Sequence, residues 1–259
     1  MNDYWKDRAA TSQNKLANKN IKQIERQLRK YYNTTFKHVI TDFEATYNKL
    51  LETISEEREP TPADLYKLDK YWKMQGQLRK ELQKLGDRQI KALSTAFEHN
   101  FFEVYYSIKV KGAEAFTTID NSLVTQMINA IWCADGKSWS QRIWDNMSRL
   151  QQTLNDGLIE IVASGKKNSE LKKLLQERFG VSYSRADSLV RTEVAHIQTE
   201  AAKKRYEDYG IQEVEFWAEP DERTCEVCGK LHKKRYPVGA AVPLPAHPRC
   251  RCVLLPVVE

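Results

Sequence analysis

The sequence predicts a mainly α protein with a small β module at its C-terminal end. Apolar residues recur every three or four positions over most of the first 210 residues, which is the period of amphipathic helices. After Gly210 this period stops, and short β-prone runs are interrupted by prolines. Four of the five cysteines also lie in this last stretch. We therefore expect three parts: a long-helix N-terminal arm over residues 1–111, a helical body over 112–210 and a cysteine-bearing β module over 211–259.

The N-terminal arm is expected to begin with one long amphipathic helix. Its apolar stripe comprises Ile21, Ile24, Leu28, Tyr32, Phe36, Val39, Phe43, Tyr47, Leu50 and Ile54. Pro62 is expected at an early position of a second helix, which continues the pattern to Ile108 with Gly86 as a weak point. Gly112 closes the region. Because both stripes are long and narrow, we expect them to pack as a hairpin and to need a partner helix that this chain does not supply.

The helical body is expected to contain four shorter helices. Capping boxes at Ser138 and Ser184 mark the starts of two of them. Gly180 is expected to end the helix over residues 169–179. The expected helices span residues 122–133, 138–163, 169–179 and 184–209. Four tryptophans are expected to anchor the core: Trp132, Trp139, Trp144 and Trp217.

The C-terminal module is expected to contain three short strands, around residues 214–217, 236–242 and 253–258. Cys225 and Cys228 are spaced as a metal-binding knuckle, and His247 and Cys250 repeat the spacing on the returning chain. Cys252 is a fifth candidate for four places, because alternate residues of an extended strand point the same way. We predict one structural zinc ion here. Reduced thiols in a packed tail and a disulfide remain as alternatives.

Arg191 and Glu193 lie near the margins of the apolar face of the last body helix. They could orient a catalytic or ligand group, but we favour a structural role in which they tie this helix to the β module through charged hydrogen bonds. His196 and Glu200 are one turn apart on the same helix, and we expect them to form a solvated pair.

The charge is mildly basic, with a formal net charge of +6. Residues 1–50 hold ten Lys and Arg against five Asp and Glu, and Lys233, Lys234 and Arg235 form a patch in the tail. These charges suit either solvated helix faces or contact with DNA phosphates. The N-terminus lacks the apolar core of a signal peptide, and we expect a reducing cytoplasm. No nucleotide-binding loop or catalytic triad pattern is present, so we expect no enzyme.

The order of these motifs resembles one known family. The motifs are Gly136-Lys137-Ser138-Trp139-Ser140, Arg142-Ile143-Trp144, Arg191-Thr192-Glu193, Trp217, Asp221-Glu222-Arg223-Thr224-Cys225-x2-Cys228 and His247-Pro248-x-Cys250-Arg251-Cys252. Together they resemble the phage Mu protein F-like family of minor head (head morphogenesis) proteins, over roughly residues 137–256. The N-terminal helices resemble the arms of such proteins from phages and prophages of Gram-positive bacteria.

The resemblance implies a phage minor capsid protein. Such a protein binds the portal during procapsid assembly in the host cytoplasm. It stays in few copies inside the virion head near the portal, and some members contact packaged DNA. The family's motif maps onto the five metal-ligand candidates and onto Arg191 and Glu193.

Two rival functions remain open. One is a metal-dependent nuclease or toxin-like enzyme that uses His196, Glu200 or His247. The other is a non-phage zinc protein that binds nucleic acid. An ion with an open coordination position and a carboxylate ligand would favour the enzyme.

Overall fold

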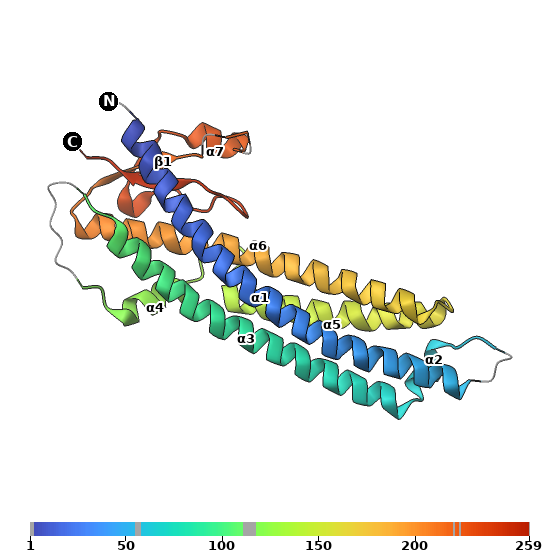
Figure 1. Ribbon diagram of the computed structural model, residues 1–259. Coiled ribbons are helices and arrows are strands. Elements are labelled where there is room, and N and C mark those ends of the chain that lie inside the picture. The colour runs from blue at the N-terminus through green and yellow to red at the C-terminus, as the bar shows by residue number, and fades with distance from the viewer. Residues whose placement is uncertain (1–2, 55–57, 111–117, 220, 223, 259) are drawn as a thin grey trace. The chain divides into compact units, whose positions relative to one another are not determined.

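The structure is a computed structural model that describes residues 3–54, 58–110, 118–219, 221–222 and 224–258. It confirms the predicted fold class, because helices dominate and a small antiparallel sheet lies near the C-terminus (Figure 1). In chain order the elements are α1 (Tyr4–Thr53), α2 (Pro62–Tyr66), α3 (Asp69–Ser107), α4 (Asn121–Asn129), α5 (Trp139–Ala163), α6 (Asn168–Asp208), β1 (Glu213–Trp217), α7 (Glu226–Leu231), β2 (Arg235–Pro237), the 3-10 turn η1 (Val238–Ala240) and β3 (Val253–Pro256). Gly112 and Arg223, which the sequence singled out, lie outside the described residues.

Two of the expected helices are joined in the structure. α6 runs without a break through Gly180 and Ser184, so the helix end at Gly180 and the helix start at Ser184 are wrong. Glycine inside a helix costs only about 1 kcal/mol relative to alanine. The burial of Phe179 and Ser182 on either side of this position outweighs that cost. Other boundaries differ as well: α1 begins at Tyr4 rather than near Ile21, the helix expected from Pro62 to Ile108 is divided into α2 and α3, and the second strand is shorter than expected.

The apolar stripe of α1 is buried within this chain. Leu28, Phe43 and Leu50 are fully enclosed, as are most other members of the stripe. The expectation that the stripe needs a helix from another protein is therefore wrong. Sequence periodicity shows that a helix has a buried face, but it does not show which helix covers that face.

The chain forms two compact units, each built from segments that are distant in sequence. Unit 1 comprises Met1–Glu25, Leu93–Trp139 and Ser188–Glu259. Unit 2 comprises Arg26–Ala92 and Ser140–Asp187. The three-part division at residues 111 and 210 stays a prediction from the sequence. The two units combine segments from different parts of that division.

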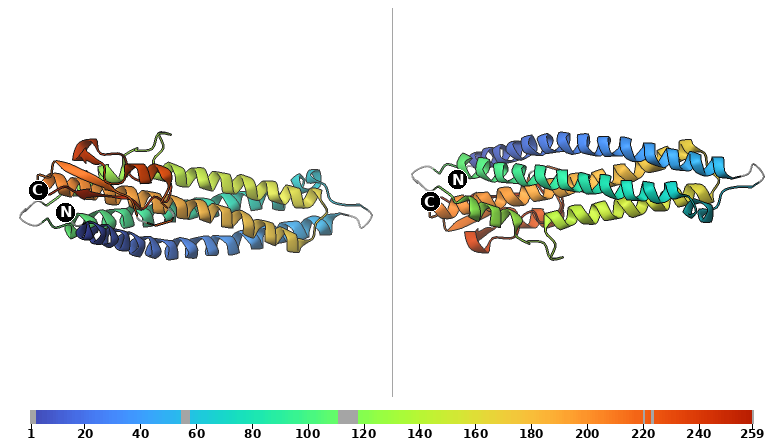
Figure 2. Two further views of the ribbon diagram at one scale, coloured as in Figure 1. Left: turned by 90° about the horizontal axis from the view of Figure 1, so that it is seen from above. Right: turned by 90° about the horizontal axis from the view of Figure 1, so that it is seen from below.

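Unit 2 is a packed set of helical segments from α1, α3, α5 and α6, and α3 runs back alongside α1 (Figure 2). Its centre contains a polar cluster in which Asn146 donates hydrogen bonds to the Tyr32 hydroxyl at 3.2 Å and to the Ser182 carbonyl at 2.9 Å. The ring of Trp144 packs directly on Gly86, where an added Cβ would lie 2.4 Å from the ring. The sequence marked Gly86 as a weak point, and the structure shows that it allows a close helix contact.

Unit 1 contains the three-stranded sheet, whose order is β2-β1-β3 with both pairs antiparallel. Val214 of β1 lies opposite Tyr236 on one side and Pro256 on the other. The start of α1 packs on this sheet, where Ala10 joins Trp217 in one buried apolar cluster. Among the described residues, no helix is long and apolar enough to cross a membrane.

Candidate metal centre

The first half of the cysteine cluster is the N-terminus of α7. Cys225 caps this helix in an extended conformation, and its Sγ accepts a hydrogen bond from the backbone N–H of Cys228 at 3.4 Å. This bond holds the two sulfurs at one end of a tight turn. Cys228 is buried and Cys225 is half-buried, so the pair faces inward from the surface.

The second half comes from the chain that enters β3. Arg249 adopts a left-handed backbone with φ of 63°, and the N–H of Cys250 bonds to the carbonyl of His247 at 3.1 Å. The chain therefore turns sharply between the two predicted ligands. Arg251 then forms a two-pronged ion pair with Asp221, with both N–O distances at 2.7 Å, and this pair fixes the strand that carries Cys250 and Cys252.

All five predicted ligands meet at this place. Cys225, Cys228 and His247 form one group of donor atoms within 4.8 Å of one another, and Cys228, Cys250 and Cys252 form a second. Cys228 belongs to both groups, which makes it the centre of the cluster. The four cysteines of the cluster are not joined by disulfide bonds, so the disulfide alternative finds no support here.

One pair of sulfurs in the cluster has the separation that a tetrahedral metal ion requires. The Sγ atoms of Cys228 and Cys250 are 3.9 Å apart. Zinc–sulfur bonds of about 2.3 Å in a tetrahedron place neighbouring sulfurs about 3.8 Å apart. The donors are thiol sulfurs and one imidazole nitrogen, which are the ligands of structural zinc sites. The cluster can therefore hold a metal ion, with five donors for four places.

The pKa values of the buried thiols shift in different directions. A hydrogen bond from the Cys252 thiol lowers the pKa of Cys250 to about 5. Burial raises the pKa of Cys228 to about 12. A thiolate is the form that binds metal, so Cys250 is poised as a ligand, whereas Cys228 would lose its proton when an ion arrives.

Arg191 and Glu193 occupy defined positions in unit 1. Arg191 pairs with Glu25 of α1, and the buried carboxylate of Glu193 accepts a hydrogen bond from the indole of Trp132 at 3.1 Å. These contacts link α6 to α1 and to the segment before α5. The expected link from this pair to the β module stays a prediction.

His196 does not form the solvated pair that we expected. Its side chain is 7% exposed, stacks on Trp132 with ring centroids 4.2 Å apart, and lies with Nδ1 3.2 Å from the carbonyl of Leu244. Burial lowers the pKa of His196. Glu200 accepts instead from Lys203. The expectation was wrong because a spacing of four residues shows that two side chains are neighbours on a helix, but it does not show whether they are exposed to water.

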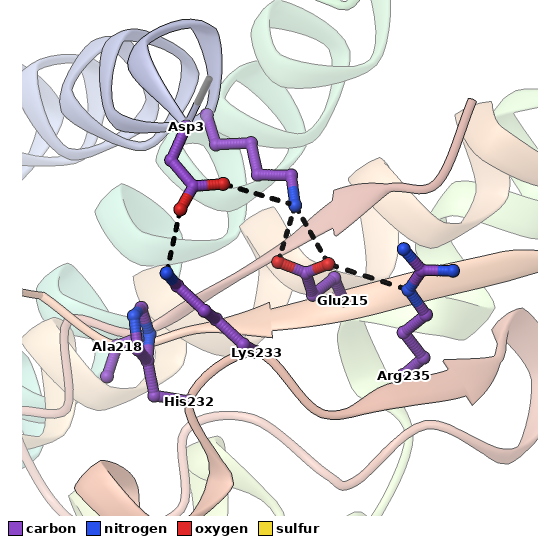
Figure 3. A network of polar contacts seen from close by, with 7 residues as sticks. Asp3, Glu215, Ala218, His232, Lys233 and Arg235 are labelled. Atoms are coloured by element: carbon purple, nitrogen blue, oxygen red, sulfur yellow. Dashed lines mark hydrogen bonds and ion pairs between the residues drawn. The ribbon is translucent and has the colours of Figure 1, made fainter. Parts of the chain in front are cut away.

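The basic patch of the tail is largely paired. Lys233 contacts Asp3 at 2.7 Å, and Arg235 lies 3.7 Å from Glu215 (Figure 3). Glu215 is buried and also accepts from Lys6 at 2.7 and 2.8 Å. Lys234 is exposed. This network fastens the start of α1 to the sheet, and the sequence had no signal for it because Lys6 and Glu215 are 209 residues apart.

The comparisons with known proteins agree with the motifs. A family model described as "Phage Mu protein F like protein" matches residues 152–255, which include the C-terminal half of α5, all of α6 and the whole cysteine cluster. No curated protein and no solved structure matches the chain. The matched segment carries the Arg191-Thr192-Glu193 helix and all five metal-ligand candidates in one fold unit with the N-terminal turns of α1. The region 152–255 therefore belongs to the phage Mu protein F-like family.

Proposed function

We propose that this protein is a phage minor capsid (head morphogenesis) protein, of the type found in phages and prophages of Gram-positive bacteria. The observation that carries the proposal is the family match over residues 152–255, together with the convergence of Cys225, Cys228, His247, Cys250 and Cys252 within it. In this function the protein binds the portal during assembly in the host cytoplasm. It then remains inside the head near the portal in few copies, where it contacts packaged DNA.

An exposed aromatic surface supports the portal contact. Trp72 is 59% exposed and Tyr66 is 43% exposed, and their rings lie 6.4 Å apart at the junction of α2 and α3. Large aromatic side chains are the commonest anchors of protein interfaces. Because the stripe of α1 is already covered, this surface replaces it as the proposed docking point.

Co-purification with the portal tests the function. Coexpressed with the portal protein of the same phage, the wild-type chain should elute with the portal ring, and Trp72→Ala should weaken that association about tenfold or more. Tyr106→Ala is the matched control, since Tyr106 is also an exposed aromatic but lies in unit 1. If the wild-type chain never elutes with the ring, the portal function is wrong. If both variants bind equally well, the docking surface lies elsewhere.

We further propose that the cluster holds one structural zinc ion. Buried sulfurs and a lack of carboxylates in the two donor groups support a closed site over a catalytic one, and they disfavour the nuclease alternative. Elemental analysis of protein purified without chelator should find about one zinc per chain, and Cys228→Ser should abolish it. A full equivalent of zinc in Cys228→Ser would contradict this ligand assignment.

A further inference from the structure

The excess positive charge of the chain lies in only one of the two units. In unit 2, Lys and Arg number 22 against 16 Asp and Glu, whereas unit 1 has 19 of each. The whole net charge of +6 is therefore in unit 2. The tail patch at Lys233 belongs to the neutral unit and is paired with carboxylates, so it is a poor place for a polyanion.

Within unit 2, four lysines of α3 form a straight row. Lys73, Lys80, Lys84 and Lys91 are separated by seven, four and seven residues, which places them within about 40° of one another around the helix. At 1.5 Å per residue the row is about 27 Å long. All four are exposed, on the side of α3 away from its buried leucines. We call these residues the α3 lysine row.

The charges of the row are incompletely neutralised. Lys73 and Lys80 have no ion-pair partner among the described residues, whereas Lys84 contacts Glu81 at 2.7 Å and Lys91 also interacts with a neighbouring group. Beside the row, Lys80 and Lys84 line a shallow groove of about 470 Å³ between α3 and α1, to which Asp42 and Glu81 also contribute. The exposed Asp87 lies near the row as well. Even with these carboxylates, the face presents a cationic line to solvent.

The character of the row identifies its partner. No large hydrophobic side chain is exposed between Lys73 and Lys91. A protein partner would need an apolar core at the contact, whereas a nucleic-acid backbone needs only repeated positive charges, because duplex DNA carries one negative charge per about 1.7 Å of its axis. The lysine ammonium is a flexible point charge and lacks the rigid, planar set of donors of arginine. It therefore suits contact with phosphates that does not depend on base sequence.

We propose that the α3 lysine row is a binding surface for the phosphate backbone of nucleic acid. This inference rests on the proposed function, which supplies DNA as the polyanion. It places the DNA contact in unit 2 and not in the tail. Binding is electrostatic and independent of base sequence, because the row contains no element that reads a groove.

The salt dependence of DNA binding tests this surface. The full chain is titrated with a fluorescent mixed-sequence duplex at several NaCl concentrations. Lys73→Gln/Lys80→Gln should reduce the slope of log K against log[NaCl] by about 2, since each lost phosphate contact removes about 0.9. Lys172→Gln/Lys173→Gln is the matched control, because it removes the same charge from exposed positions of α6 in the same unit. The control should leave the slope nearly unchanged.

Each other outcome would overturn the proposal. Equal slopes in the two double variants would mean that only net charge matters, and absence of wild-type binding at 50 mM salt would remove the surface altogether. Polyglutamate of matched charge that binds as tightly as the duplex would instead assign the row to an acidic protein. Portal co-purification of the same variants is read separately, so failure of the DNA contact and failure of the proposed head function are distinguishable.

Discussion

Two glycines of α3 show how a single residue depends on its neighbour. An added Cβ at Gly86 would lie 2.4 Å from the Trp144 ring, whereas nothing lies within 4 Å of one added at Gly76. Both positions have helical backbones, so intrinsic helix propensity favours alanine at each by roughly 1 kcal/mol. Only at Gly86 does packing oppose that gain.

We therefore expect the two alanine variants to change stability in opposite directions. Gly86→Ala should lower the free energy of unfolding by about 1–3 kcal/mol, because the tryptophan must move. Gly76→Ala should raise it by up to about 1 kcal/mol. Urea unfolding followed by circular dichroism measures both. A Gly86→Ala variant as stable as Gly76→Ala would show that Trp144 does not pack here.

At the scale of the element, α1 is held to the sheet by its first turns. Lys6 meets the buried Glu215, and Ala10 packs beside Trp217. The β module is thus partly covered by the N-terminal helix and is not an independent tail. An N-terminal deletion through residue 60 would strip this cover from the sheet, so it is a poor way to test the N-terminal helices alone.

Loss of the Lys6 charge should destabilise the attachment of α1. Lys6→Ala leaves Glu215, which is 3% exposed, with Arg235 as its remaining ion-pair partner among the described residues, and we expect a loss of about 2–3 kcal/mol. Lys19→Ala on the same helix breaks the exposed pair with Glu103 and should cost less than about 1 kcal/mol. Thermal or urea unfolding of both variants makes the comparison. Equal small losses would indicate that the Lys6 pair is not buried in solution.

For the whole molecule, the two units differ in what stabilises them. The thiol cluster belongs to unit 1, while unit 2 relies on packed side chains such as Tyr47, Phe43 and Leu78. Metal binding contributes folding free energy where the ligands are brought together by the fold. The effect of removing the metal should therefore be concentrated in unit 1.

Chelation should expose the tail and spare unit 2. After treatment with a strong zinc chelator, hydrogen exchange should accelerate in residues 225–231 and 253–256 but change little in residues 140–163. Cys228→Ser should reproduce this pattern without chelator, and Cys133→Ser, outside the cluster, should not. Uniform acceleration along the whole chain would mean that the metal stabilises both units alike.

Local sequence patterns were enough to predict the helical class, the positions of most helices and strands, and the five side chains that could bind metal. These follow from local rules, namely the 3.6-residue period and the spacing of Cys225, Cys228, His247 and Cys250. The tertiary structure alone decided that Gly180 lies inside a helix, that His196 is buried and that Lys6 reaches Glu215. It also showed that the net positive charge falls in unit 2 and that Lys233 of the tail is paired with Asp3. Each of these depends on which residues meet across long stretches of chain. Which residues meet is decided by burial and ion pairing between elements, and it cannot be predicted from a local sequence pattern.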